Sequence, residues 1–252
     1  MTTTDRLLLA DTGEAADLSA FLVRLLRFDR AAAVRLQAVA APGAPGALGT
    51  AAPTAPTAGA GAPEAAAGVL AVFGRLPLGS AGALAVRTVR LERLDAAADR
   101  TVSAGQLLEA VDDRDGTLRL PAPVTGPAWA GLLPPRTGWQ PVGEPSAEAV
   151  FPEVTAAVRE FKERSEAVPE HHRTRTVLDA LADEIWARPL AAVPELPLRA
   201  AHAAYVVGFL KPATALTVHR AGSWRRLSAP AGSIAVRTAA APGAGLGLSP
   251  LR

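Results

Sequence analysis

The chain of 252 residues is 49% hydrophobic and 20% charged, with a net charge of +2 and no cysteine. These values suit one large or two small globular domains, and they exclude disulfides, thiolate metal sites and a cysteine nucleophile. No apolar run approaches the roughly 18 residues that a membrane-spanning helix needs. The N-terminal sequence carries Asp5 where a secretory signal has basic charge, so we expect a cytoplasmic protein with no membrane partner.

Residues 1–125 predict an N-terminal α+β lobe. Apolar residues at helical spacing, such as Phe21 and Leu25, indicate an amphipathic helix, and alternating or β-branched runs indicate strands. Ser103 and Gln106 form a capping box, which marks the start of a short helix. The expected elements are strands at 5–10, 33–40, 68–78, 84–94 and 118–120, and helices at 14–28 and from Ser103 onward.

A low-complexity segment interrupts this lobe. Residues 41–63 contain no charged residue and consist almost entirely of Ala, Pro, Gly and Thr. Such a composition cannot bury enough apolar surface to offset the entropy of ordering, so we expect a flexible insertion. A phosphate-binding loop is not expected, because the glycine spacing matches neither nucleotide-binding fingerprint.

Residues 126–145 predict an ordered connection rich in proline and tryptophan. Proline removes a backbone donor and restricts its neighbour, so neither a helix nor a central strand is expected to run through this segment. Its large apolar side chains should nevertheless be buried, because indole rings usually are. The large apolar residues of the segment are Trp129, Leu132, Leu133 and Trp139, and we expect a clasp in which Trp129 and Trp139 pack into both lobes.

Residues 146–240 predict a C-terminal helical lobe closed by β-hairpin strands. Pro197 and Pro212 bracket the last of three amphipathic helices, and turns containing glycine or proline separate the strands that follow. The expected elements are helices at 152–167, 174–188 and 197–210, strands at 215–220, 224–227 and 234–237, and a flexible tail at 241–252.

The combined pattern predicts an α+β fold, in which an antiparallel sheet is accompanied by amphipathic helices. Each half contains a helix followed by three strands, so the chain can be interpreted as two related helix-plus-three-strand lobes. The similar endings ALAVRTV and SIAVRTA agree with an internal duplication. Chance similarity in a chain rich in Ala, Val and Arg is the alternative explanation.

No motif for a catalytic nucleophile, a metal site or a cofactor is recognisable, so no catalytic residue, metal or cofactor is predicted. The adjacent His171 and His172 follow Pro169, where a solvated turn between helices is expected. His202 lies on the apolar stripe of the last helix beside Tyr205. These two residues are a candidate buried polar site, and the simpler interpretation of His202 is a hydrogen-bonded core histidine.

The C-terminal hairpin is the candidate nucleic-acid-binding element. Three helices followed by a hairpin is the order of a winged helix, and basic side chains in the wing could contact phosphates. The helix in the recognition position is apolar, which argues against groove reading. The alternative is a twisted hairpin whose arginines keep a sheet edge soluble. The candidate residues are Arg220, Trp224, Arg225, Arg226 and Arg237.

The leading hypothesis from the sequence is a non-catalytic adaptor or regulatory protein that acts through contacts with a protein partner. A nucleic-acid-binding protein that uses the basic hairpin is the alternative. A third hypothesis is an enzyme whose site is assembled from positions far apart in the sequence.

Overall fold

The computed structural model describes residues 6–40 and 66–238. The predicted insertion at 41–63 and the predicted tail at 241–252 lie outside the described residues. The chain divides into two compact units. The first comprises Met1–Arg75 and Val86–Leu132, and the second comprises Leu76–Ala85 and Leu133–Arg252, so the tip of one long hairpin of the first half belongs to the second unit.

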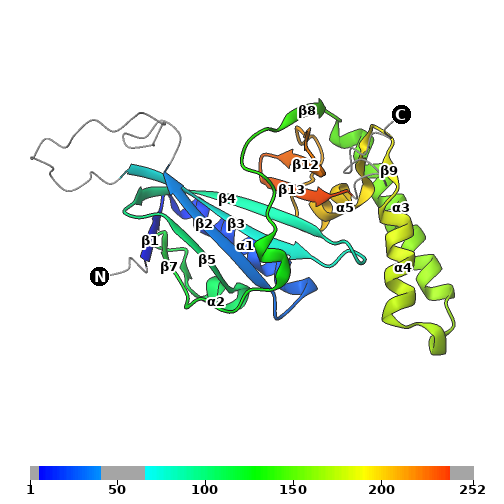
Figure 1. Cartoon of the computed structure of the whole chain (residues 1–252), viewed down its shortest axis with the longest axis horizontal. Coiled ribbons are helices and arrows are strands. Elements are labelled where there is room, and N and C mark those ends of the chain that lie inside the picture. The colour runs from blue at the N-terminus through cyan, green and yellow to red at the C-terminus, as the bar shows by residue number, and fades with distance from the viewer. Residues whose placement is uncertain (1–5, 41–65, 239–252) are drawn as a thin grey trace, which may run out of the picture. The chain divides into compact units, whose positions relative to one another are not determined.

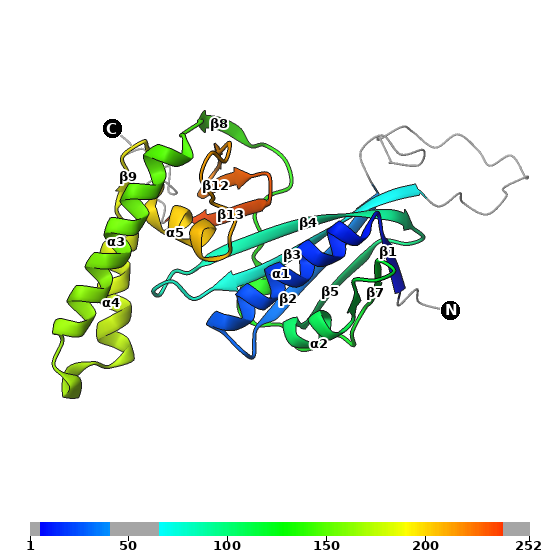
Figure 2. The same ribbon diagram turned by 180° about the vertical axis from the view of Figure 1, so that it is seen from behind.

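The first unit is an antiparallel sheet with helix α1 on it (Figures 1 and 2). Its strands follow the order β5-β2-β3-β4, and β1 pairs with β4 and with β7. The elements are β1 (Arg6–Leu9), α1 (Thr12–Phe28), β2 (Ala33–Ala40), β3 (Ala66–Leu76), β4 (Ala83–Leu94), β5 (Ala98–Ser103), α2 (Ala104–Glu109), β6 (Val111–Asp112), β7 (Thr117–Arg119) and the 3-10 helix η1 (Ala128–Gly131).

Helix α1 begins at a side-chain cap and buries one apolar stripe. The Asp11 carboxylate accepts a hydrogen bond of 2.9 Å from the backbone N–H of Glu14, as expected for an N-cap. Its stripe, which includes Phe21 and Leu25, is fully buried. Gly74 of β3 permits this close packing, because a Cβ there would lie only 2.6 Å from a methyl carbon of Leu25.

The second unit combines helices α3, α4 and α5 with antiparallel strands (Figure 1). Its strand order is β13-β12-β11-β8, and β9 pairs separately with β10. The elements are β8 (Gln140–Gly143), α3 (Ala147–Ala167), the 3-10 helix η2 (Glu170–His172), α4 (Arg175–Trp186), β9 (Pro189–Leu190), β10 (Val193–Pro197), α5 (Leu198–Val206), β11 (Thr217–Ala221), β12 (Trp224–Ala229) and β13 (Gly232–Arg237).

The α+β prediction is confirmed, and each unit contains a helix followed by three consecutive antiparallel strands, α1-β2-β3-β4 and α5-β11-β12-β13. Several boundaries differ from the expectation. Helix α3 begins before Pro152, because Ser146 caps it by accepting from the N–H of Ala149 at 3.2 Å. Helix α5 ends before Gly208, whose positive φ of 77° is incompatible with helix.

The proline- and tryptophan-rich connection is less buried than predicted. Leu132 is 48% exposed, whereas Trp129, Leu133 and Trp139 are partly buried, so Leu132 is the residue of this set that departs from the expected burial. The segment contains η1 and also β8, which has Pro141 and ends the strand order as an edge strand. An edge strand tolerates proline because one side of it needs no ladder donor. The clasp itself stays a prediction.

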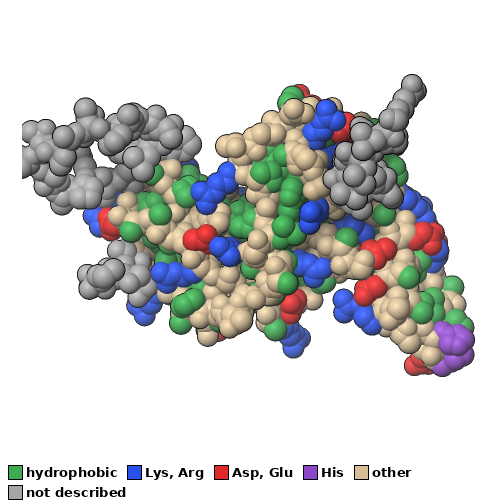
Figure 3. Space-filling model, viewed as in Figure 1, with side chains coloured by type: hydrophobic (Ala, Val, Ile, Leu, Met, Phe, Trp, Pro, Cys, Tyr) green, Lys and Arg blue, Asp and Glu red, His purple; other side chains and the backbone are tan. Residues whose placement is uncertain are grey.

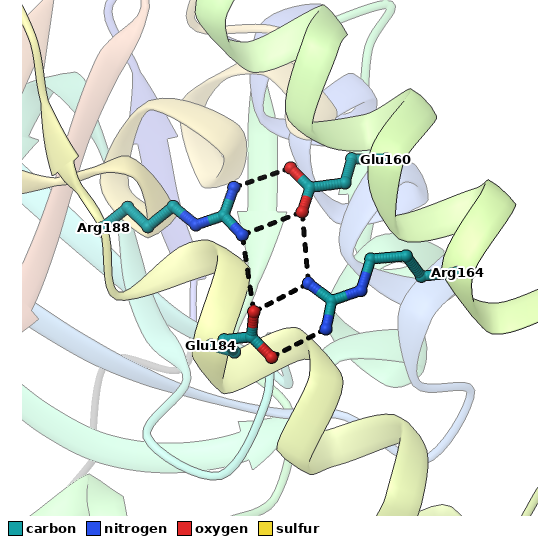
Figure 4. A network of polar contacts seen from close by, with 4 residues as sticks. All are labelled: Glu160, Arg164, Glu184 and Arg188. Carbon is teal, nitrogen blue, oxygen red and sulfur yellow. Dashed lines mark hydrogen bonds and ion pairs between the residues drawn. The ribbon is translucent and has the colours of Figure 1, made fainter.

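A ring of four charged side chains joins α3 to α4 (Figure 4). Arg188 donates to both carboxylate oxygens of Glu160 at 2.6 and 2.8 Å, and Arg164 donates to both oxygens of Glu184 at 2.7 Å. Hydrogen bonding from Arg188, followed by that from Arg164, lowers the pKa of Glu160 from 4.5 to about 2. The ring therefore stays charged at neutral pH and holds the two helices in register.

None of the helices in the described ranges has the length and apolar character needed to cross a membrane.

Candidate binding face of the C-terminal sheet

Strands β11, β12 and β13 present two chemically different faces. Val218, Leu227 and Ile234 are cross-strand partners, and all three are buried. Helix α5 packs against β12 and β13, and Figure 2 shows it beside these strands. Because side chains alternate along a strand, the neighbouring positions lie on the opposite face. That second face carries His219 and Arg226, which are only partly buried.

The five residues predicted for nucleic-acid binding divide between these faces. Arg220 and Arg225 lie on the face that includes Val218 and Leu227, and each places a nitrogen 3.6 Å from the same carboxylate oxygen of Glu195. Their charge is thus partly compensated inside the unit. Trp224, Arg226 and Arg237 lie on the opposite face, so the predicted hairpin does not form one basic patch.

Arg226 stacks on a tryptophan that the sequence pattern did not connect with it. Its guanidinium carbon lies 4.2 Å from the centre of the Trp139 ring, which is a cation–π contact. The indole N–H of Trp139 donates to the backbone oxygen of Pro135 at 2.8 Å, which orients the ring. Trp139 directly precedes β8, and β8 pairs with β11, so only strand pairing brings Trp139 to this face.

The charge on this face has no counterion among the residues that the structure describes. In the part of the chain that the structure describes, no ion pair joins Arg226 or Arg237 to a carboxylate. The Nε atom of Arg226 is buried without a hydrogen-bond partner, and burial lowers the pKa of this guanidinium. The Arg226 side chain as a whole is only partly buried. Arg237 makes a 3.3 Å hydrogen bond to the hydroxyl of Ser223.

His219 completes the face at the position directly opposite Arg226. Its Nδ1 atom is buried without a hydrogen-bond partner, like Nε of Arg226. We call Trp139, His219, Trp224, Arg226 and Arg237 the tryptophan–arginine face. The sequence placed Trp139 in the connection and His219 at the start of the hairpin, but it predicted neither as a binding residue. The only available signal was the alternation of His219 with Val218 and Arg220, which does not show what lies across the sheet.

The second site predicted from the sequence pairs His202 with Tyr205, but these two side chains contact different helices. The imidazole of His202 stacks on Trp186 of α4 with ring centres 3.9 Å apart. Tyr205 is 38% exposed and meets Phe151 of α3 edge to face at 5.5 Å. Among three cavities on the described residues, the largest has about 760 Å³ and lies in the first unit beside Arg6, and none of the three is lined by His202. The two side chains therefore do not converge on a common cavity among these three.

The burial of His202 predicts a pH-dependent stability. Burial lowers the pKa of His202 from 6.5 to about 4, so between these values the unfolded chain binds the proton more readily than the folded chain. Stability should be constant with respect to this group above pH 6.5 and fall as the pH drops toward 4, by on the order of 3 kcal/mol. Urea unfolding at pH 7 and pH 4.5 measures this loss. His202→Gln should reduce this loss of stability between pH 7 and pH 4.5, whereas His171→Gln should leave it unchanged. Equal losses in the two variants would contradict the assignment of the loss to His202.

The adjacent histidines lie at the end of the α3–α4 hairpin. His171 and His172 are both exposed in η2, and their ring centres are 4.1 Å apart; they form the purple patch at the end of the hairpin in Figure 3. Among the described residues, no group of three or more histidine or carboxylate side chains is placed to hold a metal ion.

Comparisons with known proteins divide the chain near the point where its two compact units meet in sequence, although residues 76–85 fall in the first family match and in the second unit. Residues 2–131, just over half of the chain, match the family model described as Domain of unknown function (DUF8010). The chain belongs to this family. Residues 134–241 match a second model, Domain of unknown function (DUF8185). The gap between the two matches contains the division between the compact units at Leu132 and Leu133, so the tryptophan–arginine face lies within the DUF8185 match. No curated protein and no solved structure matches the chain.

Proposed function

We propose that this DUF8010 protein is a non-catalytic adaptor or regulatory protein that binds an anionic partner on the tryptophan–arginine face. The observation that carries the proposal is the stacking of Arg226 on Trp139 without a carboxylate partner among the described residues. The arginines on the opposite face of the same hairpin differ in this respect, because Arg220 and Arg225 share an ion pair with Glu195.

Partial burial gives this arrangement its binding capacity. A guanidinium in a partly desolvated position interacts more strongly with an incoming anion than one in open water, because the effective dielectric constant is lower. Folding has already removed part of the water around Arg226, so less desolvation remains when an anion binds. The planar guanidinium group can donate hydrogen bonds to two oxygens of a carboxylate or phosphate. Tryptophan and arginine are also the residue types that most often dominate binding energy at interfaces.

The burial of α5 argues against one version of the nucleic-acid hypothesis. Leu198, Ala200, Ala201 and Ala204 of this helix are all buried. A recognition helix must expose polar side chains to base edges in the major groove, so α5 is unsuited to the winged-helix role.

The enzyme hypothesis is also less well supported, because His202 and Tyr205 contact different helices.

The two faces of the hairpin permit a matched test with a labelled polyanion such as fluorescein–heparin. Arg226→Gln with Arg237→Gln should weaken binding and reduce the slope of log K against log salt by about 1.5, because two contacts with anionic groups are lost. The pair Arg220→Gln with Arg225→Gln, on the other face of the same strands, should leave affinity and slope unchanged. Fluorescence anisotropy over a salt series measures both. Salt-independent binding, no binding, or equal losses in the two double variants would refute the proposal.

A further inference from the structure

We infer that the anionic partner is a single-stranded nucleic acid, whose bases stack on the aromatic and guanidinium planes of the tryptophan–arginine face. This inference rests on the proposed function and names the partner of the same site. It concerns Trp139, Trp224, Arg226 and Arg237, and it leaves out Arg220 and Arg225, which face Glu195.

A stacking surface is already formed on this face. The hydrogen bond from the indole of Trp139 to Pro135 orients the ring, and the guanidinium of Arg226 already lies on it. Bases of single-stranded nucleic acids stack both on aromatic rings and on arginine planes, and such stacking tolerates any base. A base placed on the solvent side of Arg226 would extend an existing stack, so little side-chain entropy would be lost on binding.

The spacing of the planar groups favours a single strand over a duplex. Trp224 and Arg226 lie two residues apart on β12, and therefore on one face. Two residues of a strand span about 6.6 Å. Successive bases in a duplex are about 3.4 Å apart along a strand. Neighbouring bases that use Trp224 and Arg226 must therefore be unstacked from each other, which a single strand permits and a duplex does not.

Arg237 supplies a phosphate contact beside the stacking groups. It is exposed and is the cross-strand partner of Trp224. Its Nε bonds to the hydroxyl of Ser223, which leaves the terminal nitrogens of the guanidinium for an anion. A backbone phosphate next to a base on Trp224 would lie within reach of this side chain. Carboxylates of an acidic peptide could pair with Arg226 and Arg237, but they would not use the indole planes.

The test compares polyanions that differ in whether they carry bases and in whether those bases are free to unstack. A labelled thymidine oligonucleotide of about 12 nucleotides, a duplex of the same length, heparin and polyglutamate are titrated into the full chain and followed by anisotropy. We expect the single strand to bind more tightly than the duplex or polyglutamate. Trp139→Ala with Trp224→Ala should weaken single-strand binding about tenfold or more and change heparin binding less than about twofold.

Two further variants separate stacking from folding. Trp139→Phe with Trp224→Phe keeps aromatic planes and should restore single-strand affinity to within about threefold of the wild type. Trp129→Ala removes a half-buried indole from the other unit and should leave affinity unchanged. Far-ultraviolet circular dichroism confirms that each variant is folded.

The outcomes distinguish this inference from the proposed function. If the Arg226 and Arg237 variants lose heparin binding while the tryptophan variants bind the single strand normally, the anionic face stands and the single-strand inference is overturned. Equal or tighter binding of the duplex or of polyglutamate overturns it in favour of those partners. Absence of binding to every polyanion overturns both proposals.

Discussion

Replacing Asp183 by alanine is expected to destabilise the C-terminal unit by about 3 kcal/mol. One carboxylate oxygen of Asp183 accepts a 2.7 Å hydrogen bond from Arg199, and both oxygens lie 3.1 Å from the backbone N–H of Ser80. The Arg199 side chain is only 9% exposed, and burial lowers its pKa although the nearby Asp183 raises it. Without Asp183, the buried guanidinium would lose the carboxylate that neutralises it and Ser80 would lose an acceptor.

The chain offers a close control on the same helix. Asp179 and Asp183 both have side chains that are 31% exposed, and each is paired with an arginine. The partner of Asp179 is Arg175, which is 75% exposed, so Asp179→Ala should cost no more than about 0.5 kcal/mol. Urea unfolding followed by tryptophan fluorescence measures both. The double variant Asp183→Leu with Arg199→Met should recover much of the loss; a similar cost for both aspartates would contradict the argument.

Substitution of Gly79 by alanine should also destabilise this unit, by about 3 kcal/mol. Gly79 has a φ of 68°, and a Cβ there would collide with the carboxylate of Asp183. The left-handed conformation alone costs an alanine about 1 kcal/mol, and the collision adds the cost of displacing the carboxylate from Ser80 and Arg199. Thermal unfolding of the variant should show a corresponding decrease in midpoint.

Gly222 separates the two contributions. It has a φ of 54°, and a Cβ added there would have no atom within 4 Å, so Gly222→Ala should cost only about 1 kcal/mol. In a background that already carries Asp183→Ala, the cost of Gly79→Ala should fall to the same value, because the colliding group has been removed. Additive losses in that double variant would show that the carboxylate is not the obstacle.

Local patterns were sufficient for most elements of the fold. The stripe that contains Phe21 and Leu25 predicted α1, and the alternation over 33–40 predicted β2 with its observed bounds. The cap at Ser103 was predicted from the spacing of Ser103 and Gln106, and Ser103 accepts a hydrogen bond from the backbone N–H of Gln106. Strands β5, β6, β8, β9 and β10 were missed. The last three are short and contain proline, so their backbone pairing is decided by neighbouring strands and not by propensity. No such signal explains why β5 was missed.

The candidate site depended on information that local patterns do not carry. The hairpin sequence showed five residues in one basic element, but alternation across β11 and β12 sends Arg220 and Arg225 to one face and Arg226 to the other. Trp139 lies far from Arg226 in the sequence, and only the pairing of β8 with β11 places its ring beside the guanidinium.

The amino-acid sequence by itself determined the α+β class, the helical stripes, the caps and the absence of cysteine chemistry, because these depend on residue types at short spacing. Tertiary structure alone decided which charges are compensated and which are not. Glu195 partly compensates Arg220 and Arg225, whereas among the described residues Arg226 has an aromatic plane in place of a carboxylate. Compensation of charge depends on distance in space, and that distance is set by strand pairing and by the face on which each side chain lies.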